Sequence, residues 1–177
     1  MINVNEYAKA LFLLAEEDGS TDVALSDVKM IKRLLAENPD YKNLLDTPAL
    51  PKQEKLALID EAFSGIHENT KNLLKILCER HGIYSFPKIA DAFALLYDES
   101  RKIERVEAVS AIELTDAQLD ALREKLQALT GKTIIINNTV DPSIIGGMKL
   151  RYSGKQLDGS LKTRLESFEQ TLRTTVI

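Results

Sequence analysis

The sequence predicts a multidomain protein of the α + α/β class. A six-helix bundle is expected over residues 1–104 and a small α/β module over residues 105–177. Two observations lead to this prediction. Apolar residues recur every three to four positions through the first hundred residues, which is the period of amphipathic helices. After residue 105 the period falls towards two in several β-branched stretches, which indicates strands.

Six apolar stripes in residues 1–104 predict six helices. Pro39, Pro51 and Pro87 stand where the third, fourth and sixth helices should begin, because proline suits the first helical position. Thr21 or Asp22 can cap the second helix. The stripes, in chain order, are Tyr7, Ala8, Leu11, Phe12 and Ala15; Leu25, Val28, Ile31 and Leu35; Leu44 and Leu45; Leu56, Ile59 and Phe63; Leu73, Leu74, Leu77 and Cys78; and Ala90, Phe93, Ala94 and Tyr97.

The second module has the predicted order β-α-β-β-β-α. Its first helix should begin at a capping box formed by Thr115 and Gln118, whose side chains can each satisfy the other's backbone N–H. Gly131 should end that helix, since glycine tolerates the left-handed conformation found there. Strands are expected at 105–112, 133–140, 145–152 and 155–158, and a last helix should carry Leu161, Leu165, Phe168 and Leu172.

Charge and composition exclude several functional classes. The chain holds 23 basic and 27 acidic residues, a net charge of −4, so it lacks the basic excess of a general nucleic-acid binder. Residues 1–104 carry a net charge of −5 and residues 105–177 a net charge of +1. This difference suggests that the two modules bind different partners. With one cysteine and two histidines, a disulfide or a zinc site of Cys pairs cannot form within the chain.

No motif in the sequence supports catalysis or cofactor binding. The Lys132 region resembles the end of a phosphate loop, but it ends a helix and precedes a strand, the reverse of the required order. The Gly146-Gly147 pair lacks the further glycines of a dinucleotide-binding loop. Cys78 lies on the apolar side of its helix and is expected to be a buried hydrophobe. We therefore expect neither a catalytic residue nor a cofactor.

Two stretches resemble the delta subunit family of F-type ATP synthases, which includes the mitochondrial oligomycin-sensitivity-conferring protein. The C-terminal stretch runs from Ile145 to Leu165 and the N-terminal one from Tyr7 to Phe12. The C-terminal stretch matches the family signature, which we expect to be architectural. One departure is that Ser153 stands where the family usually has glycine, with Gly154 following, so the turn there is expected to be shifted. The signature positions are Gly146, Gly147, Arg151, Asp158, Gly159, Ser160, Arg164 and Leu165.

The resemblance implies a stator role in the peripheral stalk, without chemistry of its own. The family's groove between the first and fifth helices receives an N-terminal helix of an alpha subunit. Its C-terminal module holds the C-terminal ends of the b subunits. In this chain the groove would be formed by Tyr7, Ala10, Leu11, Leu14, Leu73, Ile76 and Leu77. Most of these positions could equally be ordinary helix core, and only Ala10, Leu14 and Ile76 lie off the main stripes.

The resemblance also implies where the protein works. It would associate with the cell membrane only through the synthase complex. The N-terminus lacks the features of a transit peptide, which favours the cytoplasmic face of a bacterial membrane. Two alternatives stay open from the residues alone. One is an enzyme or nucleotide-binding protein built on the α/β module, and the other is a helical adaptor unrelated to the synthase.

Overall fold

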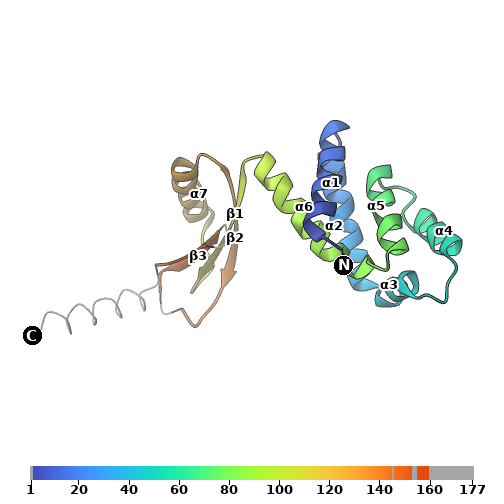
Figure 1. Ribbon diagram of the computed structural model, residues 1–177. Coiled ribbons are helices and arrows are strands. Elements are labelled where there is room, and N and C mark those ends of the chain that lie inside the picture. Colours follow the sequence, from blue (N-terminus) through green and yellow to red (C-terminus); the bar gives the residue numbers. More distant parts are fainter. Residues whose placement is uncertain (1, 145, 153–154, 160–177) are drawn as a thin grey trace, which may run out of the picture. The chain divides into compact units, whose positions relative to one another are not determined.

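The computed structural model describes residues 2–144, 146–152 and 155–159 (Figure 1). The chain divides into two compact units, Met1–Ser100 and Arg101–Ile177. Within the described residues there are seven α-helices, one short 3-10 helix and four strands. The mixed helical and α/β class predicted from the sequence is therefore confirmed. The first strand begins at Ile103, so its first two residues precede the boundary at 104/105 that the sequence suggested.

The described part of the first unit is helical throughout. Pro39 is the first residue of its helix, as predicted. The predicted cap of the second helix is wrong: Ser20 is the N-cap residue, and Thr21 already belongs to the helix. Pro51 is likewise the cap before its helix. The helices are α1 (Val4–Glu17), α2 (Thr21–Glu37), α3 (Pro39–Asp46), α4 (Lys52–Ala62), α5 (Glu68–Glu79), η1 (Ile83–Ser85) and α6 (Phe86–Ser100).

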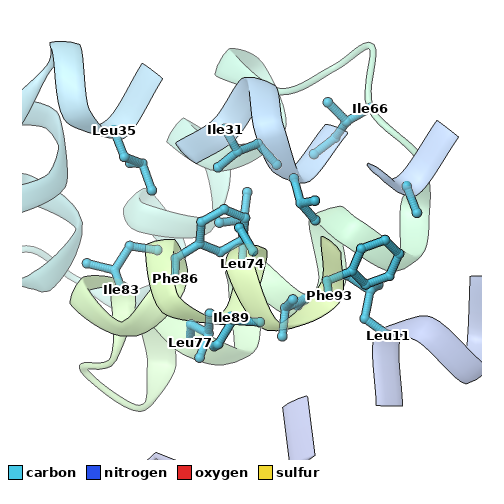
Figure 2. Close-up of a cluster of buried hydrophobic side chains, with 14 of the residues drawn as sticks. Leu11, Ile31, Leu35, Ile66, Leu74, Leu77, Ile83, Phe86, Ile89 and Phe93 are labelled. Carbon is cyan, nitrogen blue, oxygen red and sulfur yellow. The ribbon is translucent and has the colours of Figure 1, made fainter. Parts of the chain in front are cut away.

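One hydrophobic core holds these helices together. Phe86, Ile89 and Phe93 on α6 are fully buried. Figure 2 shows them among side chains from α1, α2 and α5, and Figure 1 shows α6 running beside α1 and α2. The rings of Phe12 and Phe93 meet edge to face, with their centroids 5.8 Å apart. The apolar stripes predicted from the sequence therefore face a common interior.

The second unit is built on a four-stranded sheet in the order β2-β1-β3-β4. β1 and β2 are parallel, with Ile103 opposite Thr133, and α7 connects them. β3 pairs antiparallel with both β1 and β4. The elements are β1 (Ile103–Ser110), α7 (Asp116–Thr130), β2 (Thr133–Val140), β3 (Met148–Tyr152) and β4 (Lys155–Asp158).

The start and end of α7 confirm the sequence prediction. Thr115 accepts from the N–H of Gln118, and the Gln118 side chain accepts from the N–H of Thr115. Gly131 follows the helix with φ of 67°, a left-handed conformation that suits glycine. α7 covers one face of the sheet, where Val106, Leu126 and Ile134 form a small core.

Two strand predictions need correction. The first strand spans Ile103–Ser110 and not 105–112; beyond it, the Ser110 hydroxyl donates to the Ile112 carbonyl and the chain bends. The third strand begins at Met148 and not at residue 145, because Gly147 has a φ of 82°, which a regular strand does not accommodate. The predicted final helix and the turn at Ser153-Gly154 lie outside the described residues.

Candidate binding surfaces

α1 and α5 are antiparallel neighbours, because contacts join opposite ends of the two helices. At one end the Asn69 amide donates to the Asp18 carboxylate at 2.7 Å. At the other end Ile2 covers Gly82 so closely that a Cβ on this glycine would lie 1.6 Å from the Ile2 Cδ1. The glycine therefore lets the chain before α1 pack against the end of α5. This pairing places the seven residues of the predicted groove on adjacent helices.

The seven predicted groove residues divide into two sets. Leu11, Leu73 and Leu77 are buried in the core of the first unit, and Tyr7 is half-buried against it. The other three are exposed. We call these three, Ala10, Leu14 and Ile76, the α1/α5 face.

The α1/α5 face has the composition of a helix-docking surface. Leu14 is 47% exposed and Ile76 is 43% exposed, so both side chains are available to a partner. Ala10 and Leu14 are four residues apart, so they share one side of α1. The small side chain of Ala10 would allow the apolar side of an amphipathic helix to approach α1 closely. The buried leucines beneath support this surface without being available to a partner.

A second apolar surface on the first unit was not predicted. A cavity of about 260 Å³ lies between α1 and α6, lined by residues that include Ala8, Ala92 and Leu95. Leu95 is 71% exposed. The sequence contained a signal for it, since Leu95 falls outside the apolar stripe of α6. That signal is weak, because single exposed leucines are common on protein surfaces.

Two signature residues of the second unit, Arg151 and Asp158, lie on one face of the sheet. Arg151 on β3 lies opposite Glu107 on β1, and its guanidinium is 3.3 Å from that carboxylate. On its other side it donates to the Gln156 side chain of β4 at 3.2 Å. Lys149 lies opposite Asp158, with 3.5 Å between ammonium and carboxylate. We call these five residues the charged face; it lies on the side of the sheet away from the core with α7.

The structure describes the backbone of Gly147 and one ion pair of Asp158. Gly147 was expected at the start of a strand, where a Cβ would crowd a neighbouring chain. It precedes β3 instead, and its left-handed φ is the property that calls for glycine. Asp158 was expected to accept from the start of the last helix, which lies outside the described residues. Within the described residues, its carboxylate lies 3.5 Å from the Lys149 ammonium on the neighbouring strand, a cross-strand contact that the sequence did not predict.

The other signature positions are partly described. Gly159 donates its N–H to the Met148 carbonyl at 3.0 Å, and an added Cβ would lie 3.3 Å from the same oxygen. Gly146 lies in the bend before β3. Ser160, Arg164 and Leu165 lie outside the described residues, so their roles remain predictions.

The described residues contain no group of three or more His, Cys, Asp or Glu side chains gathered as they would be around a metal ion. None of the helices described is long and apolar enough to span a bilayer. The geometry of the described residues instead offers surfaces suited to binding other chains.

Comparison with known proteins identifies the family. The family model for the "ATP synthase delta (OSCP) subunit" matches residues 4–172. The chain is 37% identical to the ATP synthase subunit delta of Geobacillus sp. strain WCH70, over 97% of each chain. It is 36% identical to the same subunit of Azorhizobium caulinodans, over 94% of this chain and 91% of that one.

A solved structure supports the fold. A chain in the cryo-EM structure of the Toxoplasma gondii mitochondrial ATP synthase hexamer matches with a TM-score of 0.73, over 97% of this chain and 98% of that chain. Its sequence identity is 23%, so this likeness concerns the fold alone. The family match and the two bacterial relatives together show that the chain belongs to the ATP synthase delta (OSCP) subunit family.

Proposed function

We propose that this chain is the stator link that joins the catalytic head of an F-type ATP synthase to its membrane-anchored b subunits. Family membership makes the chain a delta subunit and a component of the peripheral stalk. A stalk of this kind prevents the head from turning with the central rotor, so that rotation driven by an ion gradient can produce ATP. The match over residues 4–172, which includes both units, is the observation that carries this proposal.

In this proposal the first unit works as a six-helix bundle that binds the N-terminal helix of an alpha subunit. The α1/α5 face is the proposed docking surface, with Ala10 at the point of closest approach. Its exposed Leu14 and Ile76 would be covered by the apolar side of the bound helix, which is how an amphipathic helix gains affinity. Leu11, Leu73 and Leu77 would act indirectly, by holding α1 and α5 in place.

The second unit is proposed to bind the C-terminal segments of the b subunits. This assignment is supported by the difference in net charge between the two parts of the chain, which is −5 in residues 1–104 and +1 in residues 105–177. The charged face would contribute by fixing the three strands β1, β3 and β4 in register. The signature would then act on b binding through the architecture of the sheet.

The remaining aspects of the role follow from the same assignment. The chain would be non-catalytic, would need no cofactor and would lie on the cytoplasmic face of the cell membrane as a peripheral part of the complex. An adaptor unrelated to the synthase is not supported, since family relatives cover nearly the whole chain.

Binding experiments with the full-length chain test the proposal. Calorimetric titration with a peptide of the alpha-subunit N-terminus, and separately with a C-terminal segment of b, should give two saturable and independent binding events. Titration with ATP serves as the control for the enzyme alternative and should give none. If the chain binds neither subunit segment, the proposed link between head and stalk is wrong.

A further inference from the structure

A cavity of about 210 Å³ lies between the start of α4 and the end of α5. Its polar lining comes from Lys52, Lys55, Cys78, Glu79 and His81, and two leucines and a proline complete the wall. Neither the α1/α5 face nor the charged face includes any of these residues. The cavity therefore needs an explanation of its own.

Lys55 is the unusual member of this lining. Its residue exposure is only 5%. Within the described ranges, the Lys55 side chain has no hydrogen bond and no ion pair. The low exposure belongs to the residue as a whole, because a long lysine side chain can bury its aliphatic stem while the ammonium stays at the surface of a cavity. The Lys55 side chain thus lines an open space that an anion could enter.

The neighbouring polar groups are mostly engaged elsewhere. Glu79 pairs with Lys52 at 2.9 Å. The Cys78 thiol donates to the Leu45 carbonyl at 3.2 Å, and burial raises the pKa of this thiol, which keeps it uncharged. The His81 Nδ1 lies 3.1 Å from the Asp46 carbonyl and so acts as a donor. Acidic groups therefore lie near the cavity, yet none of them forms an ion pair with Lys55.

The backbone adds a second source of positive potential. The first N–H groups of any α-helix lack intrahelical partners, and in α4, which begins after Pro51, no side chain at the cap accepts from them. The facing end of α5 differs, because its carbonyls at Ile76, Leu77 and Cys78 accept from the N–H groups that follow the helix. An uncapped N-terminus favours a bound anion.

We propose that this cavity binds a small oxyanion, a phosphate or carboxylate group, with Lys55 as its principal partner. The first turn of α4 would provide the remaining positive potential, since the charge of Lys52 is already balanced by Glu79. A volume of about 210 Å³ suits one such group and is below the ~300–1,000 Å³ usual for larger ligands such as nucleotides. The site would be independent of binding to other synthase subunits.

The test titrates the full-length chain with inorganic phosphate, and separately with acetate, against chloride at matched ionic strength. Backbone amide spectra should show saturable shifts at the first turn of α4 and at His81 for at least one anion. The melting temperature should rise in parallel, because a ligand that binds only the folded state stabilises it. The arm that saturates identifies which oxyanion is bound, and shifts in neither arm would contradict the proposal.

Three variants separate a built site from general salt effects. Lys55→Met should weaken anion binding about tenfold or more, because a charge-assisted hydrogen bond is lost. Lys55→Arg should keep most of the binding, and Lys88→Met, an exposed lysine on α6, should leave it unchanged. Unaltered binding in Lys55→Met would overturn the proposal. If Lys55→Met fails to fold, the comparison of Lys55→Arg with the wild-type chain still locates the shifts.

Discussion

The described parts of the two units differ in the interactions that stabilise them. Among the described residues, the core of the first unit contains 21 buried apolar residues, whereas that of the second contains Val106, Leu126 and Ile134. The first four helices have no side-chain cap, while α7 has a complete capping box. In the part of the chain that the structure describes, burial of apolar surface is thus the main stabilising feature of the first unit, and directional polar contacts are more prominent in the second.

The difference bears on the stator role. A stator has to transmit force between two partners without changing shape. A helical unit with a large core can present an apolar surface such as the α1/α5 face while its interior remains intact. A sheet held by pairs across its strands keeps its register under load, because each pair fixes one strand relative to the next.

The largest effect is expected for Phe93→Ala in the first unit. Phe93 is fully buried and packs edge to face with Phe12. Its truncation should lower the free energy of unfolding of this unit by about 3–5 kcal/mol. Native-state hydrogen exchange should show faster exchange across α1, α5 and α6. Leu95→Ala on the same helix is the control. Leu95 is 71% exposed, so its truncation should lower the free energy of unfolding only slightly. Equal losses in both variants would contradict the large-core account.

Asn138→Ala should have the largest effect of a polar change in the second unit. The Asn138 side chain donates to the Ala108 carbonyl at 2.9 Å and to the Ser110 hydroxyl at 2.8 Å, and it accepts from the Leu114 N–H. Its loss leaves partly buried partners unsatisfied, which should cost the second unit about 2 kcal/mol. Chemical denaturation of Asn138→Ala measures this loss of stability, and Asn137→Ala, at an exposed neighbouring position, is the control. Similar midpoints for the two variants would exclude the polar network as a support.

Gly147→Ala should have a smaller effect, because the change strains only the backbone. A residue other than glycine at φ of 82° costs about 1 kcal/mol, and hydrogen exchange of β3 should report the loss. Gly131→Ala is the matched control, because Gly131 also has a left-handed φ of 67° but lies at the end of α7, so its loss should leave β3 unaffected.

Gly146→Ala, the change next to Gly147 in the chain, tests the turn itself. A larger loss in Gly146→Ala than in Gly147→Ala would show that crowding, and not φ, requires glycine in this turn.

The smallest effect concerns Tyr41, whose hydroxyl donates to the Leu58 carbonyl at 3.1 Å. Burial raises the pKa of Tyr41 from 10.0 to about 12, with smaller contributions from Cys78 and Glu61. Between these two values the unfolded chain loses the phenol proton before the folded chain does, so stability should fall as pH rises from 10 to 12. Tyr41→Phe should reduce this alkaline loss relative to the wild-type chain, as measured by denaturation at each pH. An unchanged pH profile would show that the phenol is not protected.

Local chemistry made much of this fold predictable from the sequence. The capping box at Thr115, the stop at Gly131 and the strand Thr133–Val140 were predicted correctly, because each depends on residues close together in the chain. The apolar stripes also predicted the buried faces of the helices. These features need no knowledge of tertiary contacts.

Contacts between distant residues were not predictable in the same way. The Asn138 network joins residues 24 to 30 positions apart, and nothing in the strand sequence marks it. The burial of Lys55 could not be predicted from the sequence, because it depends on the packing of α4 against α5. The predicted groove on α1 and α5 could be divided into core and surface only once the exposure of each residue was known. Its binding role remains a prediction.

The most direct test of the proposed stator link is the affinity of Ala10→Glu for the alpha-subunit peptide and for the b segment. Ala10 is exposed, so the variant should keep the melting temperature of the wild-type chain. Alpha-peptide affinity should fall about tenfold or more, because the bound helix would bury an unpaired charge, while b affinity should not change. Ala57→Glu, an exposed position on α4, is the control and should bind both partners normally. Unchanged alpha-peptide affinity in Ala10→Glu, or an equal loss for both partners, would contradict separate binding by the two units.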